Sequence, residues 1–336
     1  MLLRVIKTGF ALAVIILFIS LVWLAVGLYL PRNLPAEKVF FEVEKGMDIS
    51  TVAQALKDKG LIRARLPLAI SYRLFFYPQK IKAGEYAFSS PLRPKDILSL
   101  MVKGKVYLHT VTIPEGLTAQ EIRPLVLPLL SDGEEGFQAA FKNSSPISSL
   151  DPGAKNLEGY LYPETYSFPK GISSKEVTEA LVAQFLSVFS EMRRSRGTAP
   201  GLTVREIVVL ASLIEKETGV REEKKLVSAV FHNRLRLGMK LDCDPTIIYV
   251  LKQEGRYPGR LKKKDMSLDS PYNTYLFAGL PPGPICNPGK EALKAALYPA
   301  RENYLYFVSK NDGSHHFSRT FIEHQNAVRM YQKNHH

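Results

Sequence analysis

The chain of 336 residues carries 45 lysines and arginines against 32 aspartates and glutamates, a formal net charge of +13. This charge favours anionic surroundings such as phospholipid headgroups or an acidic polymer, but the basic residues are scattered without a nucleic-acid motif, so we expect no nucleic-acid partner. The only cysteines, Cys243 and Cys286, have neither the density of a disulfide scaffold nor the spacing of a zinc site, and the sequence leaves open whether they bridge or remain free thiols.

The first predicted element is an apolar helix over residues 9–30. The segment has no charged residue, and at about 1.5 Å per residue it is long enough to cross a hydrocarbon core of roughly 30 Å. It is longer than the apolar region of a cleaved signal peptide, so we predict a permanent single-span anchor preceded by a short segment, residues 1–8. Arg4 and Lys7 before the helix are matched by Arg32 and Lys38 after it, so charge alone does not define the orientation.

Residues 39–104 have the pattern of a small α+β module. Strands are predicted at 39–43 and 84–88, and the spacing of apolar residues predicts helices at 49–56, 66–76 and 94–101. The module contains no nucleophile and no metal-ligand cluster. We therefore interpret it as a binding or spacer module.

Residues 105–153 are predicted to connect this module to a larger body over residues 154–336. A strand is expected near 107–113, a helix from about Ala119, and a loop over 132–153, which is rich in Ser, Gly, Asp and Pro. Helices follow at 175–194, 204–218 and 222–237, with a strand at 304–308. The predicted fold class is α+β: an N-terminal transmembrane helix, the small module, and a mixed α/β catalytic domain with a helical core.

One predicted helix, 204–218, ends in an unusual acid. At 100° per residue, one stripe of this helix consists of Leu210, Leu213, Ile214 and Glu217. Glu215 lies on nearly the opposite side. Burial in the last turn raises the pKa of a carboxyl, and such an acid can protonate a leaving-group oxygen near neutral pH. From helix geometry alone, the alternative is a glutamate that reaches water where the helix leaves the core.

Several ordered sequence blocks lie between residues 157 and 308. They are LEGYLYPETY at 157–166, ASLIEKET at 211–218, VFHNRLRLGM at 230–239, LDCDPT at 241–246, YNTY at 272–275, GLPPGPI at 279–285, NPG at 287–289 and YLYFV at 304–308. With these blocks, residues 39–330 resemble the endolytic murein transglycosylases of the MltG, or YceG-like, family, which are single-span proteins of the bacterial inner membrane.

The resemblance implies a peptidoglycan lytic transglycosylase. Such an enzyme cleaves the β-1,4 bond between N-acetylmuramic acid and N-acetylglucosamine in nascent glycan strands, forms a 1,6-anhydro end, and so terminates strand elongation. The catalytic glutamate of the family corresponds to Glu217, and the small module, residues 39–104, is similar to LysM, a glycan-binding fold. The resemblance places residues 1–8 in the cytoplasm and the body outside, and it suggests peptidoglycan synthases as partners. The chemistry requires no cofactor and no metal.

Further site residues are predicted from the same blocks. Candidates to stack on sugars and bond their hydroxyls are Tyr272, Asn273, Thr274 and Tyr275, for which a turn packed by tyrosines is the alternative. Candidates to line the cleft or to stabilise positive charge at the anomeric carbon are the acids Glu158, Glu164 and Asp244. Because family members commonly lack cysteine at positions 243 and 286, neither cysteine is assigned a mechanistic role.

Two other functions stay open. Hydrolytic glycosidases use two carboxylates, so a muramidase-type hydrolase would employ one of the three further acids beside Glu217. A non-catalytic scaffold of the wall-synthesis machinery would use the small module to bind glycan and the body to bind proteins.

Overall fold

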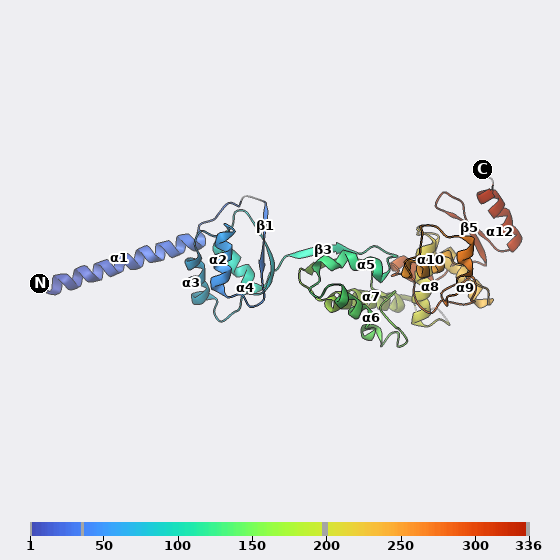
Figure 1. Ribbon diagram of the computed structural model, residues 1–336, viewed down its shortest axis with the longest axis horizontal. Coiled ribbons are helices and arrows are strands. Elements are labelled where there is room, and N and C mark those ends of the chain that lie inside the picture. Colours follow the sequence, from blue (N-terminus) through green and yellow to red (C-terminus); the bar gives the residue numbers. More distant parts are fainter. Residues whose placement is uncertain (1, 35–36, 197–200, 334–336) are drawn as a thin grey trace. The chain divides into compact units, whose positions relative to one another are not determined.

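A computed structural model describes residues 2–34, 37–196 and 201–333 of the chain as a mixed α+β protein (Figure 1). It divides into two compact units. The N-terminal unit comprises Met1–His109 with Ser167–Gly171, and the C-terminal unit comprises Thr110–Tyr166 with Ile172–His336. The fold class predicted from the sequence is confirmed at this level.

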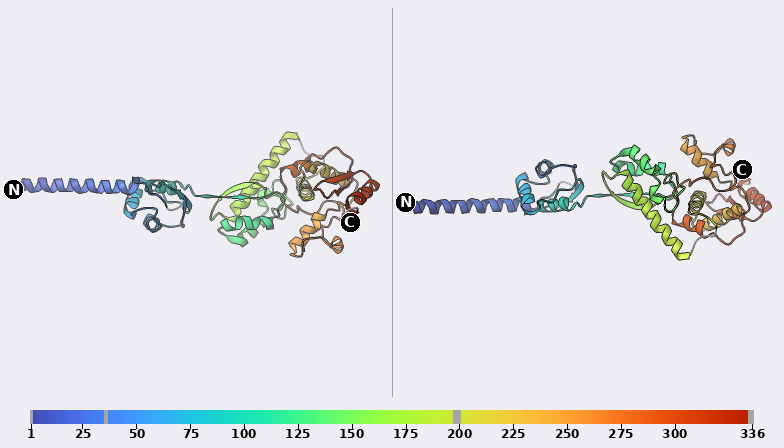
Figure 2. Two further views of the ribbon diagram at one scale, coloured as in Figure 1. Left: turned by 90° about the horizontal axis from the view of Figure 1, so that it is seen from above. Right: turned by 90° about the horizontal axis from the view of Figure 1, so that it is seen from below.

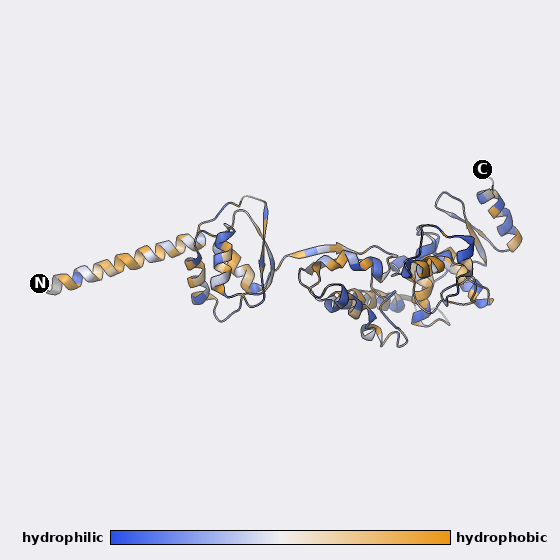
Figure 3. Cartoon of the chain, in the orientation of Figure 1, coloured by the Kyte–Doolittle hydropathy of each residue, from blue (hydrophilic) through white to orange (hydrophobic). Residues whose placement is uncertain are grey.

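The N-terminal unit begins with the long apolar helix α1, Leu2–Tyr29. Its stretch Val5–Tyr29 is long and apolar enough to cross a membrane, and Figure 3 shows hydrophobic residues along most of its length. Only its last turns are covered by the folded part of the unit, where Leu28 is buried and Leu24 packs against the core. The helix therefore starts earlier than predicted and ends within the unit that follows it.

The predicted small module is present with all five of its elements. They are β1 (Lys38–Val43), α2 (Ile49–Asp58), α3 (Arg65–Phe75), β2 (Gly84–Ser89) and α4 (Pro94–Lys103). The two strands pair antiparallel, with Phe41 opposite Tyr86. The carboxylate of Asp48 accepts a hydrogen bond from the Thr51 amide and caps α2, and Gly104 ends α4 in the left-handed conformation that glycine adopts without strain.

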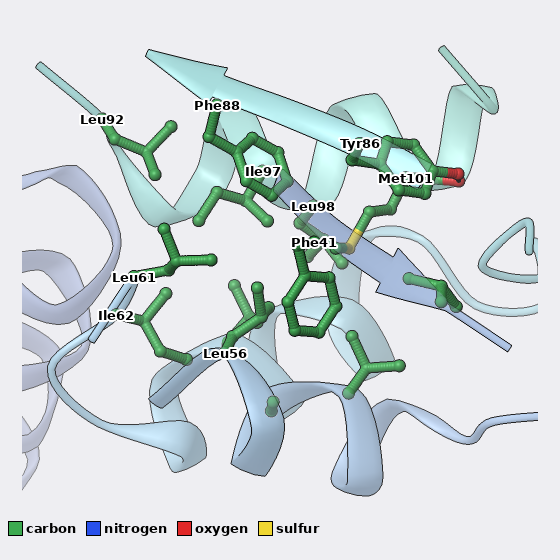
Figure 4. Packing of buried hydrophobic residues seen from close by; sticks show 14 of the residues in the cluster. Phe41, Leu56, Leu61, Ile62, Tyr86, Phe88, Leu92, Ile97, Leu98 and Met101 are labelled. Carbon is green, nitrogen blue, oxygen red and sulfur yellow. Dashed lines mark hydrogen bonds between the residues drawn. The ribbon is translucent and has the colours of Figure 1, made fainter. Parts of the chain in front are cut away.

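A single hydrophobic core holds this module together (Figure 4). Every second side chain of the strands, among them Phe41 and Phe88, points into it, and helices α2 and α4 contribute residues such as Leu56 and Met101. The one polar atom of these large core side chains, the Tyr86 hydroxyl, donates to the carbonyls of Lys82 and Met101 at 2.7 and 3.2 Å. The core is therefore apolar and its buried hydroxyl is satisfied.

The C-terminal unit is mainly helical. Its helices are α5 (Ala119–Val126), α6 (Gly133–Lys142), α7 (Ser174–Arg196), α8 (Val204–Glu217), α9 (Lys224–Arg236), α10 (Asp244–Gln253), α11 (Lys290–Leu297) and α12 (Phe321–Val328). Short helical turns are η1 (Leu127–Leu129), η2 (Ser145–Ile147), η3 (Lys263–Ser267) and η4 (Arg329–Lys333). Strands β3 (Leu108–Thr112) and β4 (Thr165–Pro169) form one two-stranded sheet, and the division between the units falls within them.

Helix α8 is the centre of the C-terminal unit, in contact with α9, α10 and α11. A capping box begins this helix, since Thr203 and Glu206 each satisfy a backbone amide of the other at its first turn. Every residue from Ile207 to Ile214 is buried. This part of the helix is thus covered on all sides. The stripe that ends in Glu217 is therefore not the only buried side of the helix.

The prediction of a loop over residues 132–153 is wrong in its first part, which forms α6. Phe137 on α6 is 1% exposed, and the helix packs against α7. Asp132 ties the two together, because its carboxylate accepts hydrogen bonds from the Ser174 hydroxyl at 2.6 Å and the Ser174 amide at 3.1 Å. The polar composition of this segment belongs to the exposed side of a short helix rather than to a loop.

The last elements lie together at one edge of the C-terminal unit (red in Figure 2). Strands β5 (Tyr306–Ser309) and β6 (His315–Ser318) form an antiparallel hairpin, and α12 packs on both of them. Strand β5 contacts α9, which brings the hairpin close to the helical core.

Candidate active site

Glu217 is the last residue of α8, and Thr218 follows it in an extended conformation as the C-terminal cap. Unlike the residues one and two turns before it, Glu217 is only partly buried. Its side chain lines a cavity of about 460 Å³ in the C-terminal unit. The predicted acid therefore leaves the core at the point where the helix ends, with its carboxyl accessible to a ligand in that cavity.

Three parts of the C-terminal unit surround this cavity: the helical core, the segment 241–244 with Tyr275, and the hairpin with α12. The lining residues are Glu217, Arg234, Leu241, Asp242, Asp244, Tyr275, Tyr306, Phe307, Val308, Ser309, His315, Phe321, His324, Val328 and Gln332. The mixture of carboxylates, aromatic rings and hydroxyls is typical of a site that binds sugars, where rings stack on the apolar faces and polar groups bond the hydroxyls.

Two of the predicted residues meet at the wall of this cavity. The Tyr275 hydroxyl donates a hydrogen bond of 2.6 Å to Oδ1 of Asp244, which is exposed in the first turn of α10. Burial raises the pKa of Tyr275, and its bond to Asp244 adds to that rise, so the phenol stays protonated as a donor. A carboxylate in the first turn of a helix is also stabilised by the helix dipole.

Cys243 lies against the carboxyl of Glu217, with which its thiol forms a hydrogen bond. Both cysteines are free and buried. The backbone around Cys243 is held by two buried threonines: its amide donates to Thr274 Oγ1 at 2.9 Å, and its carbonyl accepts from Thr246 Oγ1 at 2.7 Å. No local sequence pattern predicts this contact, because Cys243 is distant from Glu217 in the sequence.

The Arg234 side chain fixes the segment that carries Cys243. Its guanidinium donates to the carbonyls of Lys240 and Leu241 at 3.1 and 3.0 Å, and to Oδ2 of Asp242 at 3.0 Å. Asp242 itself has a φ of 49°, a left-handed conformation that aspartate tolerates better than most residues. Arg234 thus stabilises the tight turn that places residues 243 and 244 beside Glu217.

The pKa of Glu217 is raised to about 7, chiefly by burial and further by the charge of Asp244. The Cys243 thiol and the charge of Arg234 act in the opposite direction. An acid with this pKa is substantially protonated near neutral pH and can also accept a proton back. It has the properties of a general acid and base.

Glu215, two residues earlier on α8, lies in a different environment. Its Oε1 forms an ion pair of 2.7 Å with Lys224 Nζ, and both side chains are less than a tenth exposed. Its Oε2 accepts a hydrogen bond of 3.0 Å from the Gly289 amide at the start of α11. This acid joins three helices, and its oxygens are occupied.

Glu158 is brought to a different place from Glu217. It is 3% exposed, and its carboxyl accepts hydrogen bonds from the Ala119 amide at 3.0 Å and from Asn287 Nδ2 at 2.9 Å. It borders a second cavity of about 470 Å³, which Tyr272 and Arg205 also line. Burial raises the pKa of Glu158 to about 8. The structure therefore groups Glu158 with Tyr272 and not with Glu217.

The remaining predicted site residues have different surroundings. Asn273 is fully buried, and its amide donates to the carbonyls of Met266 and Leu268 at 3.0 and 2.8 Å, which organises its own loop. Thr274 is 2% exposed and holds Cys243 as described above. Glu164 is exposed and does not line the cavity of Glu217. Of the YNTY block, only Tyr275 faces that cavity.

Most of the cavity residues, among them Arg234 and His324, were not among the predicted site residues. Arg234 lies within one of the ordered blocks, but nothing in the local pattern shows that it reaches residues 240–242. His324 comes from α12, outside every block, and its Nδ1 is buried without a hydrogen-bond partner among the described residues. Burial lowers the pKa of His324 and keeps the ring neutral. Only the packing of the hairpin and α12 brings it to the cavity.

Comparison with known proteins places the chain in a family. Residues 41–330 match the model of the YceG-like family. A protein from Bacillus subtilis named endolytic murein transglycosylase is 30% identical over 328 residues, covering 88% of this chain and 87% of its own length. A protein of the same name from Streptococcus pneumoniae is 29% identical, and the match covers 85% of this chain but 57% of that longer protein.

A solved structure is similar as well. The crystal structure of a yceG-like protein from Listeria monocytogenes has a TM-score of 0.56 and 31% sequence identity, and the match covers 86% of this chain and 98% of that one. The family match includes both units and spans almost the whole of the described chain after α1. The chain belongs to the YceG-like family.

Proposed function

We propose that this protein is an endolytic peptidoglycan lytic transglycosylase with Glu217 as its catalytic acid. The observation that carries the proposal is a partly exposed carboxyl, with a pKa raised to about 7, at the wall of a cavity of about 460 Å³. The family relatives named endolytic murein transglycosylase support the same activity. The substrate is the β-1,4 bond between N-acetylmuramic acid and N-acetylglucosamine.

One carboxyl is sufficient for this reaction. Protonated Glu217 donates its proton to the glycosidic oxygen as the bond from that oxygen to C1 of the muramic residue breaks. The carboxylate then removes the proton of the C6 hydroxyl, whose oxygen forms the new bond to C1 and closes the 1,6-anhydro ring. No water is consumed, and Glu217 ends protonated as it began. Because the nucleophile belongs to the same sugar, proximity replaces the activation of an external water.

In this proposal, the residues around Glu217 bind the glycan or stabilise the charge that develops on it. Asp244 and Tyr275 form a hydrogen-bonded pair at the cavity wall, suited to a sugar hydroxyl or to positive charge at the anomeric carbon. Glu158 and Tyr272 line the second cavity and would contact a more distant part of the glycan. The contacts of Asn273 and Thr274 favour a role in supporting the loop.

Product analysis tests the reaction. Digestion of purified cell wall with the wild-type protein should release chains that end in 1,6-anhydro-muramic acid, and Glu217→Gln should release none. Glu222→Gln, which changes an exposed glutamate after α8, is the matched control and should retain activity. Reducing ends that carry one water more would instead establish a hydrolase, with Asp244 as the second carboxylate because it lines the same cavity. Glycan binding without cleavage would establish the scaffold.

Location follows from the substrate. In the proposed arrangement α1 spans the cytoplasmic membrane, residues 1–8 lie in the cytoplasm, and the rest lies outside, where nascent glycan emerges. A span limits how far Glu217 can move from the bilayer and so favours cleavage of new strands. A periplasm-active reporter fused to the C-terminus should be active, whereas activity of a cytoplasm-specific reporter at that position would contradict the arrangement.

We also propose that the N-terminal unit binds glycan through aromatic side chains, as the LysM-like prediction implies. Phe40 and Tyr107 meet edge to face with ring centroids 5.0 Å apart, and Tyr107 makes a similar contact with His109. Aromatic rings of this kind stack on sugars, so Tyr107→Ala should weaken sedimentation with purified sacculi. Peptidoglycan synthases stay a predicted partner, which co-purification from membranes would test.

A further inference from the structure

Helix α3 has an apolar surface that the folded part of the protein leaves uncovered. This α3 apolar face consists of Leu66, Ile70, Leu74 and Phe75 of α3 and of Tyr77 just after it, whose exposed fractions range from 39% to 73%. The first three recur at four-residue spacing and so form one stripe. Among the described residues 37–109, the other large hydrophobic residues with comparable exposure are Phe40 and Leu108. Exposed apolar area in this part of the chain is therefore concentrated on α3.

The opposite side of α3 shows that this exposure is a property of the fold. Pro67 and Leu68 are buried, and Ser71 is 4% exposed, so these residues fix how the helix is turned on the core. A helix anchored in this way cannot rotate to hide its outer stripe without losing its packing.

The charged residues of the segment that contains α3 have one sign. Residues 61–82 contain five basic residues, Arg63, Arg65, Arg73, Lys80 and Lys82, and no aspartate or glutamate. All five are exposed. An exposed apolar stripe with basic residues beside it is the pattern of helices that lie in the interface of anionic bilayers.

The position of α3 beside α1 points to the same environment. A Cβ atom added at Gly27 would lie 2.6 Å from Pro67 Cγ, so the two helices approach closely and a side chain at 27 would separate them. Leu28, one residue later, is buried in the core of the unit. In Figure 1, α3 lies at the edge of the unit where α1 enters it. This contact occurs in the last turn of the stretch Val5–Tyr29, which is long enough to cross a membrane.

We infer that α3 lies in the headgroup region of the bilayer that α1 spans, with the α3 apolar face inserted among the lipids. The inference rests on the membrane anchoring proposed above. Of the 25 residues in the apolar stretch, about 20 suffice to cross a hydrocarbon core of roughly 30 Å. Counted from Gly9, where the uncharged segment begins, about 20 residues end at Leu28, so Gly27 is at the outer boundary of the hydrocarbon core, next to the headgroups, and the helix packed on it lies at that level too. The basic residues then face lipid phosphates.

A consequence is that the N-terminal unit has two contacts with the membrane. A single helix allows the attached unit to turn about the helix axis and to tilt, whereas a second contact to one side of that axis restricts both motions. The unit would hold a constant orientation toward the bilayer, and with it the starting point of the chain that leads to the C-terminal unit.

Site-specific fluorescence on the full-length chain in liposomes of phosphatidylcholine and phosphatidylglycerol tests the inference. Because Cys243 and Cys286 are buried, a new exposed cysteine at Leu74→Cys can be labelled selectively with an environment-sensitive dye. We expect a blue-shifted emission, several-fold brighter than at the matched control Lys45→Cys, an exposed position after β1, and quenching by lipids spin-labelled near the headgroup. Leu17→Cys, in the middle of α1, reports on the span itself through lipids labelled deep in the chain.

Each outcome has a separate meaning. A deep signal at position 17 with a water-like signal at position 74 would overturn the inference and leave the proposed anchor intact. A water-like signal at both would overturn the anchor and the inference together. A blue shift at position 74 without quenching by lipid would show a protein contact instead, and would also overturn the inference. Replacing Leu66 and Ile70 with serine should reduce quenching at position 74 without lowering the thermal midpoint, because both side chains are exposed.

Discussion

In the C-terminal unit, burial raises the pKa of Glu217 to about 7 and that of Glu158 to about 8, but the surroundings of these two carboxyls differ. The carboxyl of Glu158 receives hydrogen bonds from the Ala119 amide and from Asn287, and it connects segments far apart in the chain. Glu217 ends a helix, is partly exposed to a cavity, and has a thiol as its hydrogen-bonded neighbour. A raised pKa alone therefore does not identify a catalytic acid, since access and free oxygen atoms also matter.

Substitution of each acid by glutamine is the most direct test of this difference between Glu217 and Glu158. Glu217→Gln should reduce the turnover of purified glycan by about 10²- to 10⁴-fold, the usual contribution of a general acid. Glu158→Gln keeps an oxygen that can accept from Ala119 and Asn287, so its turnover should stay within a few-fold of the wild type. Release of anhydro products measured by chromatography provides both rates. A larger loss of turnover for Glu158→Gln than for Glu217→Gln would show that Glu158, and not Glu217, is the catalytic acid.

The free energy of unfolding should respond in the reverse order, with the larger loss for substitution of Glu158. Glu158→Ala leaves the Ala119 amide and the Asn287 side chain without their buried acceptor, which should cost about 2–4 kcal/mol of unfolding free energy, whereas Glu217→Ala should cost less because no backbone group depends on it. Thermal unfolding measures both. Equal losses would show that Glu217 is held as firmly as Glu158.

Glu158 should also make the stability of the protein depend on pH. Because the pKa of Glu158 is about 8 in the folded protein and close to 4.5 when unfolded, the folded state binds the proton more tightly. Its contribution to stability is complete below about pH 4.5 and is lost as the pH rises through about 8. Glu158→Gln should remove this part of the pH dependence, and an unchanged profile would refute the raised pKa.

Activity should depend on pH through Glu217, because only the protonated carboxyl can donate to the glycosidic oxygen. kcat/KM should fall as the pH rises above about 7. The charge of Asp244 raises the pKa of Glu217, so Asp244→Asn should move this limb of the profile to lower pH, by less than about one unit. If this limb does not move, the charge of Asp244 does not affect the pKa of Glu217.

The smallest expected effect concerns the thiol. The Cys243 hydrogen bond lowers the pKa of Glu217, so Cys243→Ala should move the limb in the opposite direction, by a few tenths of a unit, with kcat reduced only a few-fold. Cys243→Ser restores a donor and should return the limb toward the wild-type position. If serine and alanine behave alike, the contact is one of packing only.

Local sequence patterns predicted much of the fold. The five elements of the small module and the central helix α8 were predicted within a few residues, because their capping residues and apolar spacing are local signals. Helices α6, α10, α11 and α12 were not predicted. Each is 8 to 10 residues long, and packing on longer helices, rather than a strong pattern of its own, keeps it folded.

By itself, the sequence determined the apolar helix at the N-terminus, the family and the position of Glu217 at the end of an apolar stripe, because these depend on composition and on spacing within one segment. Tertiary structure decided which groups surround that acid. It brought Cys243, Asp244 and Tyr275 to Glu217, separated Glu158 from it, and closed the cavity with residues of β5, β6 and α12. These contacts join residues far apart in the chain, and only the packing of the helical core and the turn stabilised by Arg234 places them together.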